Sequence, residues 1–309
     1  MPELTEARPG RRLWGERRER TSLPSVPVAA VDVAFTPAEL PAAEVAVVVD
    51  VLRATSTIAQ ALAGGYQRVH CCETLDEARA LGGPGRVLAG ERHCVKPADF
   101  AHGNSPKDLA RGRPLGQELV LATTNGTPAI AAAVRNAPRL VLLGSLLNLD
   151  AIVRAIPTHS DVVVVCSGTD GRPALEDVYV AGKIVGRLRG ERSDAAQIAL
   201  ACAHAWPAPI EPLSASADAA RLRATGQERD IAWCSRESVL DVVPVATAGS
   251  GGVVAADLAL PEGESIARPG SRAITRGPRM RRGSSTTGRA GSAGSPPASP
   301  PTPPGARAP

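Results

Sequence analysis

An acidic residue interrupts an apolar segment in the first third of the chain. Asp50 follows Val47-Val48-Val49 and precedes Val51. An ionised carboxylate inside a buried strand is costly unless it is paired, hydrogen-bonded or bound to a metal. Three roles therefore stay open for Asp50: a metal ligand, a nucleophile, or an ion-pair partner of Arg53.

The residues that follow Asp50 could bind an anion. Thr55, Ser56 and Thr57 stand where a helix is expected to begin, and the free N–H groups and positive dipole end of a helix favour a negative charge. Arg53 could hold a phosphate or sulfonate through two parallel hydrogen bonds. The alternative is that Thr55 or Ser56 only caps the helix.

Polar and glycine residues also follow four other predicted strands. The segments are Gly90-Glu91-Arg92, Thr123-Thr124-Asn125-Gly126-Thr127, Gly144-Ser145 and Ser167-Gly168-Thr169-Asp170-Gly171-Arg172. Ligands of open α/β sheets bind beyond the carboxyl ends of the strands, so these segments are predicted to surround a small anionic substrate. Asn125-Gly126 also fits an ordinary turn, and Ser167–Gly171 fits either an anion-binding nest or a tight turn.

Two further carboxylates, Glu176 and Asp177, begin a predicted helix. They could bind a metal, or they could simply complement the helix dipole. Cys166 ends a strand before Ser167-Gly168, but a small buried cysteine is the favoured interpretation over a thiolate nucleophile. No Cys-x-x-Cys pair occurs among the six cysteines, which argues against a structural zinc site.

Apolar segments that alternate with Ala-rich segments predict the elements that hold these residues. Strands are expected at 29–35, 45–51, 68–71, 86–89, 118–122, 140–143 and 161–166, with edge strands or a hairpin at 241–245 and 252–255. Helices are expected at 56–63, 75–81, 127–135, 148–155, 175–189, 194–205, 216–224 and 228–234. The alternation is typical of a three-layer α/β/α sandwich with a mostly parallel sheet.

The charge is distributed unevenly along the 309 residues. The net charge is +4 overall, +2 in residues 1–22 and +8 in residues 268–309, so residues 23–267 carry −6. An acidic body argues against nucleic-acid binding. The Arg-rich segment 1–25 and the Pro/Gly/Ser/Arg-rich segment 261–309 are predicted to be disordered extensions of a catalytic domain at 26–260. The absence of an apolar segment of 18 residues and of a signal peptide predicts a cytoplasmic protein that does not bind membranes.

Seven ordered segments resemble the 2-phosphosulfolactate phosphatase family. They are Val49–Thr57, Gly90-Glu91-Arg92, Gly103-Asn104-Ser105-Pro106, Thr123–Thr127, Leu175-Glu176-Asp177, Asp230–Cys234 and Val242–Val245. The resemblance implies two similar α/β halves, a possible homodimer, and a Mg²⁺-dependent enzyme. Its reaction would convert 2-phospho-3-sulfolactate, or a related small phosphorylated sulfonate or hydroxy acid, to 3-sulfolactate and phosphate in coenzyme M biosynthesis.

Residue roles follow from this resemblance and from the polar strand ends together. Asp50, Arg53, Glu91 and Arg92 are the expected catalytic residues, and Asp50, Glu91, Glu176 and Asp177 the expected Mg²⁺ ligands. The expected substrate-binding residues are Thr55, Ser56, Asn104, Ser105, Thr124, Asn125, Gly126, Ser145, Gly168 and Thr169. The rival hypotheses are a non-catalytic anion-binding protein and a nucleotide- or SAM-using transferase, the latter weakened because no GxGxxG follows the first strand.

Overall fold

The computed structural model describes residues 25–110, 114, 117–136, 138–249 and 254–258. The chain divides into two units, Met1–Glu262 and Gly263–Pro309, and all described residues belong to the first. The predicted extensions therefore lie almost wholly outside the described residues.

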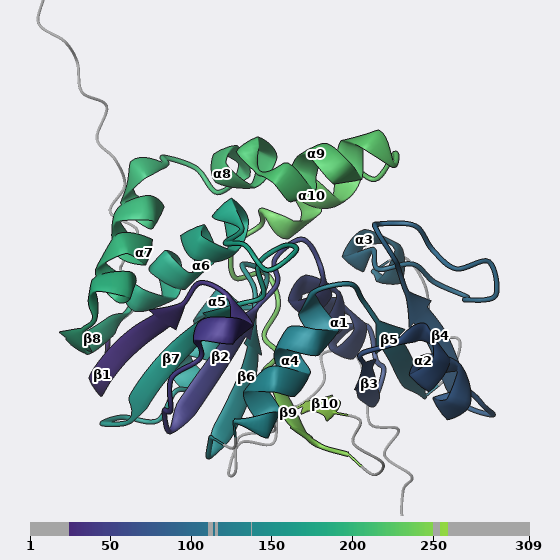
Figure 1. The fold of residues 1–309 in the computed structure, drawn as a ribbon, viewed down its shortest axis with the longest axis horizontal. Coiled ribbons are helices and arrows are strands. Elements are labelled where there is room, and N and C mark those ends of the chain that lie inside the picture. Colours follow the sequence, from purple (N-terminus) through teal and green to yellow (C-terminus); the bar gives the residue numbers. More distant parts are fainter. Residues whose placement is uncertain (1–24, 111–113, 115–116, 137, 250–253, 259–309) are drawn as a thin grey trace, which may run out of the picture. The chain divides into compact units, whose positions relative to one another are not determined.

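Ten strands of the described part of the chain form one sheet in the order β4-β5-β3-β10-β9-β6-β2-β7-β1-β8 (Figure 1). The strands are β1 Val26–Ala34, β2 Val45–Val49, β3 Arg68–Cys72, β4 Arg86–Gly90, β5 Glu118–Ala122, β6 Leu140–Gly144, β7 Asp161–Cys166, β8 Leu188–Arg192, β9 Pro244–Ala248 and β10 Val254–Leu258. One parallel group contains β6, β2, β7, β1 and β8, and another contains β3, β5 and β4. The antiparallel pair β9 and β10 joins the two groups.

The helices connect the strands and cover both faces of the sheet. They are η1 Pro37–Glu39, α1 Ala54–Ala63, α2 Leu75–Leu81, α3 Pro106–Leu109, α4 Gly126–Arg135, α5 Leu149–Ala155, α6 Leu175–Val185, α7 Asp194–Ala205, α8 Ile210–Ala215, α9 Ala217–Ala224 and α10 Arg229–Cys234. Every residue of β2 is buried, as expected for a strand with helices on both sides.

Helices α1 and α4 lie between the two parallel groups of strands. One hydrophobic core joins Ile58 of α1 and Ile130 of α4 to Val48 of β2 and Leu121 of β5. Because both helices pack against both groups, the strands on the two sides of β9 and β10 end close to the same two helix N-termini. This arrangement brings residues that follow β2, β4 and β5 to one place.

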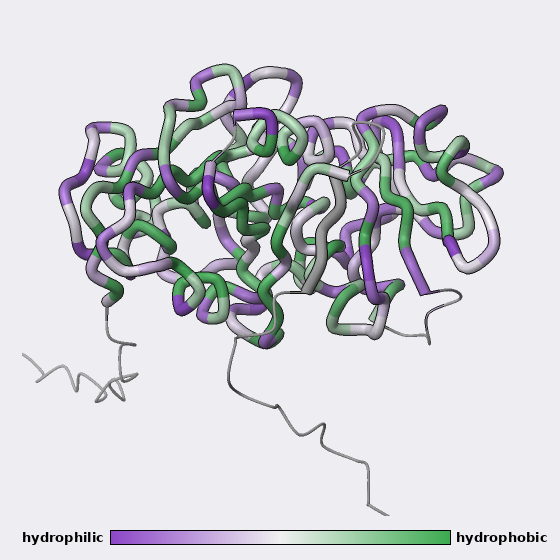
Figure 2. The backbone as a smooth tube through the Cα atoms, turned by 90° about the horizontal axis from the view of Figure 1, so that it is seen from below, coloured by the Kyte–Doolittle hydropathy of each residue, from purple (hydrophilic) through white to green (hydrophobic). Residues whose placement is uncertain are grey.

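The outer faces of the two groups carry separate cores. Helices α5, α6 and α7 cover β1, β2 and β7, and α2 covers β3 and β5. The hydrophobic stretches of the backbone run mainly through these packed strands and helices (Figure 2). The predicted α/β fold with a mostly parallel sheet is confirmed.

Two predicted elements are wrong at their ends. The strand expected at 45–51 stops at Val49, so Asp50 follows the strand and does not lie inside it. The helix expected at 175–189 stops at Val185, and Leu188–Arg192 forms the edge strand β8, which pairs with β1. The short helices α3 and α8 were not expected. Strands β5 and β7 and helices α2 and α7 have the predicted bounds.

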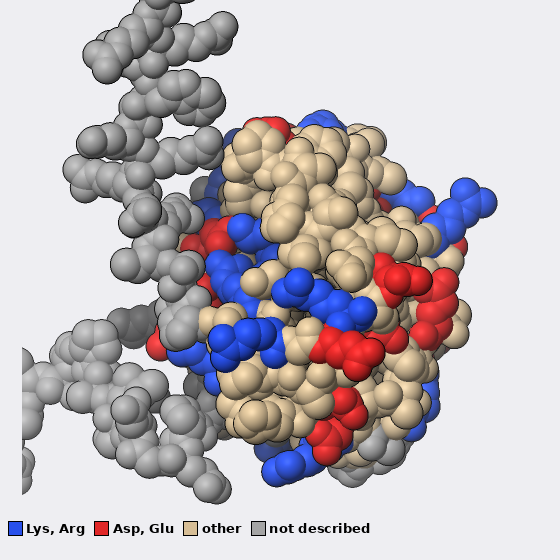
Figure 3. All heavy atoms as spheres, turned by 90° about the vertical axis from the view of Figure 1, so that its left-hand side faces the viewer, with Lys and Arg blue, Asp and Glu red and all other residues tan. Residues whose placement is uncertain are grey.

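The surface of the first unit mixes charges of both signs. On the face seen in Figure 3, Lys and Arg side chains lie among Asp and Glu side chains. None of the helices in the described ranges is long and apolar enough to cross a membrane.

Candidate active site

Asp50 follows β2 directly and faces a pocket. The residue is 7 % exposed. Oδ1 accepts a hydrogen bond from the Ala54 N–H at 2.9 Å, and Oδ2 accepts one from the Ser167 hydroxyl at 3.1 Å. The first turn of α1 therefore holds the carboxylate from one side and the residue after β7 holds it from the other.

The N-terminus of α4 lies against the same carboxylate. A Cβ atom on Gly126 would lie 2.3 Å from Asp50 Oδ2 and 2.3 Å from the Ala54 Cβ. Only glycine fits this position, because real Cβ atoms do not approach other atoms so closely. The positive ends of two helices thus meet at Asp50.

Burial raises the pKa of Asp50 to about 6, and repulsion from Asp218 and Glu91 adds to the effect, while the Ala54 and Ser167 hydrogen bonds lower it. The carboxylates of Asp50, Glu91 and Asp218 all line this pocket. Such an excess of negative charge favours a cation in the pocket when an anionic substrate binds there.

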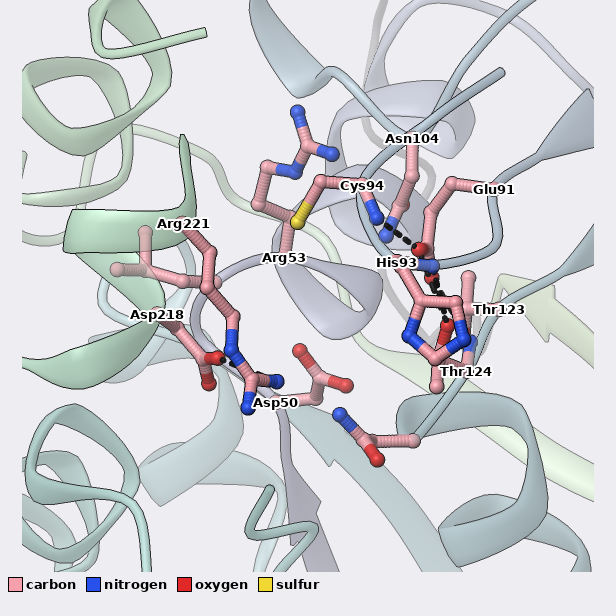
Figure 4. Close-up of a pocket in the computed structure, with 12 residues that line it drawn as sticks. Asp50, Arg53, Glu91, His93, Cys94, Asn104, Thr123, Thr124, Asp218 and Arg221 are labelled. Atoms are coloured by element: carbon pink, nitrogen blue, oxygen red, sulfur yellow. Dashed lines mark hydrogen bonds and ion pairs between the residues drawn. The ribbon is translucent and has the colours of Figure 1, made fainter. Parts of the chain in front are cut away.

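Glu91 follows β4 and connects two loops. Its Oε1 accepts from the Thr124 N–H at 2.8 Å, and Oε2 accepts from the Cys94 N–H at 2.7 Å and from the Thr124 hydroxyl at 3.1 Å. Since both oxygens have N–H donors, this carboxylate fits an ordering role better than a metal-ligand role. Figure 4 shows these hydrogen bonds beside His93.

Arg53 is buried, and its charge is already matched. Its Nη1 donates to Asp230 Oδ2 at 2.6 Å and to Gln227 Oε1. The side chains of Arg53 and Asp230 are 1 % and 3 % exposed. The ion pair thus joins α10 to the start of α1, and Asp230 also accepts from the Ser105 hydroxyl at 2.7 Å, which joins α10 to the start of α3.

Helix α9 supplies two pocket residues that the sequence did not reveal. Asp218 and Arg221 lie one turn apart and face the pocket from the side opposite Thr124 (Figure 4). Arg221 Nη2 donates to Asp170 Oδ2 at 2.6 Å, and Arg221 Nη1 lies 3.7 Å from Asp218 Oδ1. Four further lining residues had no assigned role in the sequence analysis: Leu52, His93, Cys94 and Thr123.

The structure brings six predicted site residues together and directs others elsewhere. Asp50, Arg53, Glu91, Asn104, Thr124 and Asn125 line the pocket. The buried Asn104 Oδ1 has no hydrogen-bond partner among the described residues, which marks it as an acceptor for a ligand or water. Gly126 lies against Asp50 as described above.

Other predicted residues support the backbone instead. The Thr55 hydroxyl bonds the backbone of Asp50, and the Ser56 hydroxyl donates to the Val51 carbonyl at 2.9 Å. The Ser145 hydroxyl donates to Asn148 at 2.9 Å. Arg92 donates to the carbonyls of Glu91 and Glu73 at 2.8 and 2.9 Å, and it does not line this pocket.

The remaining predicted carboxylates lie behind or beside the pocket. Asp177 accepts from the N–H groups of Val51 and Gly168 at 2.9 and 3.1 Å, and its burial raises its pKa well above the usual range. Glu176 lines a neighbouring cavity with Thr169, and burial together with Asp218 raises its pKa to about 8. Glu176 and Asp177 therefore lie apart from the Asp50 pocket lining.

The ligand set of a metal can be tested against these contacts. No cluster of three or more His, Cys, Asp or Glu residues suited to a metal is found within the described ranges. Mg²⁺ does not need one, because it is commonly held by one or two carboxylates together with water and substrate phosphate. Asp50 and the surrounding negative charge fit such a site, whereas the oxygens of Glu91 and Asp177 are occupied by N–H donors.

The fold and pocket define a class of α/β protein with an acid- and hydroxyl-lined site at the carboxyl ends of parallel strands. A family model described as 2-phosphosulpholactate phosphatase matches residues 34–249. The chain belongs to this family.

Relatives from several bacteria agree with this placement. A protein of Thermus thermophilus named "Probable 2-phosphosulfolactate phosphatase" is 39 % identical over 209 residues, covering 65 % of this chain and 87 % of the relative. Proteins of the same name from Thermotoga maritima and Deinococcus radiodurans are 38 % and 36 % identical, covering 71 % and 67 % of this chain and 96 % and 89 % of the relatives.

Proposed function

We propose that this protein hydrolyses the phosphate ester of a small acid, with 2-phospho-3-sulfolactate as the substrate and 3-sulfolactate and phosphate as the products. The observation that carries the proposal is the buried Asp50 carboxylate, which faces a pocket between the N-termini of α1 and α4. The relatives' shared name supplies the substrate.

The pocket residues fit recognition of a phosphoryl group. Asn104, Thr124 and Asn125 line it with amides and a hydroxyl. The N–H groups of Asn125 and Gly126 have no partner among the described residues, and they begin a helix whose dipole favours an anion. These groups would orient the phosphoryl oxygens around Asp50.

We further propose that Asp50 holds Mg²⁺. The ion would offset the charge of the carboxylates and of the phosphoryl oxygens. In the reaction a bond forms between water oxygen and phosphorus, the ester P–O bond breaks, and the released alkoxide takes up the proton that the attacking water loses. Asp50 Oδ2 accepts only from the Ser167 hydroxyl among the described residues, and this hydroxyl can donate to the Gly168 carbonyl at 3.1 Å instead, so the oxygen can bind the ion.

The role of Asp50 can be decided by trapping. A phosphorylated Asp50 peptide after rapid acid quench and mass spectrometry would show that Asp50 is the nucleophile. A single turnover that yields phosphate with no phosphopeptide at any time supports direct attack by water.

Three wider proposals accompany the activity. The enzyme acts in the cytoplasm, forms a homodimer, and supplies 3-sulfolactate for coenzyme M biosynthesis. They rest on the family membership and on the sequence features given above.

A screen for phosphate release over small phosphorylated acids, with and without Mg²⁺, tests the proposed function. Release that is fastest from 2-phospho-3-sulfolactate and is lost with EDTA supports it. No release from any ester, together with tight binding of 3-sulfolactate, would instead show a non-catalytic anion-binding protein.

A further inference from the structure

A second, larger cavity adjoins the Asp50 pocket. The space in the Asp50 pocket is about 30 Å³, whereas the neighbouring cavity measures about 600 Å³. Asp218 and Arg221 line both. The first space suits one small group, and the second falls in the size range of ordinary ligand sites.

Two arginines line the larger cavity. Arg221 comes from α9, and Arg172 comes from the loop that follows β7. Within the described ranges the Arg172 guanidinium makes no hydrogen bond or close ion pair and is only attracted at longer range by Asp170, so it is available to a ligand. The second arginine that lines the Asp50 pocket, Arg53, is held by the buried Asp230.

The ion pair between Arg221 and Asp170 can exchange with a ligand. Its partner Asp170 is exposed, with 55 % of the side chain accessible, and Arg221 itself is 44 % exposed. Exposed pairs of this kind contribute little free energy, about 0–1 kcal/mol. Figure 4 shows Arg221 extending from α9 toward Asp50, which puts its guanidinium at the junction of the two spaces.

We infer that Arg221, together with Arg172, forms a second anion subsite that binds the sulfonate or carboxylate of the leaving acid and so determines substrate specificity. This inference rests on the proposed function, because it assumes that the phosphoryl group occupies the pocket at Asp50. A guanidinium suits both acids, since its parallel N–H groups match two oxygens of either one.

The test compares three esters: 2-phospho-3-sulfolactate, 2-phospholactate without the sulfonate, and p-nitrophenyl phosphate without either acid. In Arg221→Gln, kcat/KM for phosphosulfolactate falls by about 10- to 100-fold, mainly through KM, because charge-assisted hydrogen bonds are lost. For p-nitrophenyl phosphate it changes by less than about threefold, since no acid group reaches the subsite. Arg221→Lys restores part of the preference, and Arg172→Gln causes a smaller loss of the same kind.

Arg223→Gln is the matched control. Arg223 lies on the same helix, is exposed, and donates to the Ser214 carbonyl at 2.9 Å outside both spaces. We expect Arg223→Gln to leave the substrate preference unchanged. An equal loss on all three esters in Arg221→Gln would mean that Arg221 acts on the phosphoryl group or only fastens α9 to the loop after β7, and it would overturn the inference.

Calorimetry of 3-sulfolactate binding measures the subsite independently of phosphate-ester hydrolysis. The inference predicts that Arg221→Gln weakens this binding by at least about tenfold while Arg223→Gln does not. If the unaltered protein binds 3-sulfolactate in this way but hydrolyses nothing, the proposed function fails and the subsite stands. No binding, or binding that is independent of Arg221, would overturn the subsite.

Discussion

The close contact between α4 and Asp50 makes Gly126 the most informative single position in the fold. Gly126→Ala puts a Cβ 2.3 Å from Asp50 Oδ2 and 2.3 Å from the Ala54 Cβ, where 3.4–4 Å is an ordinary contact. Relief therefore requires a shift of roughly 1 Å by the carboxylate, by α4 or by the start of α1.

The size of the effect follows from that shift. Overpacking of a well-packed site costs about 1–3 kcal/mol of stability. A displacement of about 1 Å at a reacting group can cost about 100-fold in rate. We therefore expect kcat for phosphate release to fall by about 100-fold in a protein that is still folded, with a modest loss in the free energy of unfolding.

Urea unfolding and phosphate release are measured on the same preparations. Gly186→Ala is the control, because its Cβ would meet Gly182 O and Leu200 Cδ1 at 3.3 Å at the exposed end of α6, far from Asp50 in the fold. It should change stability by less than about 1 kcal/mol and leave the rate unaltered. A Gly126→Ala protein with full activity would refute the placement of α4 against the reacting carboxylate.

Three other predictions concern the buried charges. The folded-state pKa of Glu176 is raised from 4.5 to about 8, so between these pH values the folded state holds a proton that the unfolded state releases. The free energy of unfolding therefore falls as pH rises through this window, by at most about 5 kcal/mol. Glu176→Gln should flatten the pH dependence of Tm, and an unchanged slope would contradict the assignment. Asp230→Ala leaves Arg53 without its carboxylate partner and should lower the free energy of unfolding in urea by about 3–5 kcal/mol. The control Arg154→Ala breaks the exposed pair with Asp241 and should lower it by less than about 1 kcal/mol. Equal losses in the two variants would contradict the importance of the buried pair. Mg²⁺ should raise the Tm of the unaltered protein but not of Asp50→Asn, and a shift of the same size in both would exclude Asp50 as its ligand.

Much of the fold follows from the sequence because its strands are strongly apolar. β7, with Val162–Val165, and β5 stand out as buried strands. β8 does not, because Leu188–Arg192 carries three charged residues, as an edge strand can, and continues the polar pattern of the preceding helix. The packing of α1 and α4 between both groups of strands depends on contacts distant in sequence, and no local pattern encodes it.

The site residues likewise divide into those that the sequence reveals and those that it does not. Asp50 could be found because it interrupts an apolar segment, and Glu91 and Thr124 because they lie within two residues of the ends of predicted strands. Asp218 and Arg221 could not, because their spacing on α9 is that of an ordinary surface ion pair one turn apart. Ser145 follows a strand as well, yet its hydroxyl turns to Asn148, and sequence gives no signal of that direction.

The central claim is that Asp50 is required for phosphate-ester hydrolysis and not for the fold. In Asp50→Asn, the amide can still accept from the Ala54 N–H with its oxygen and face the Ser167 hydroxyl with its nitrogen, so the structure is expected to persist. The most direct measurement is phosphate release from 2-phospho-3-sulfolactate by this variant, with 3-sulfolactate binding measured in parallel. The account predicts a rate at least about 1,000-fold below that of the unaltered protein with the acid still bound. A rate within about tenfold of the unaltered protein would contradict it.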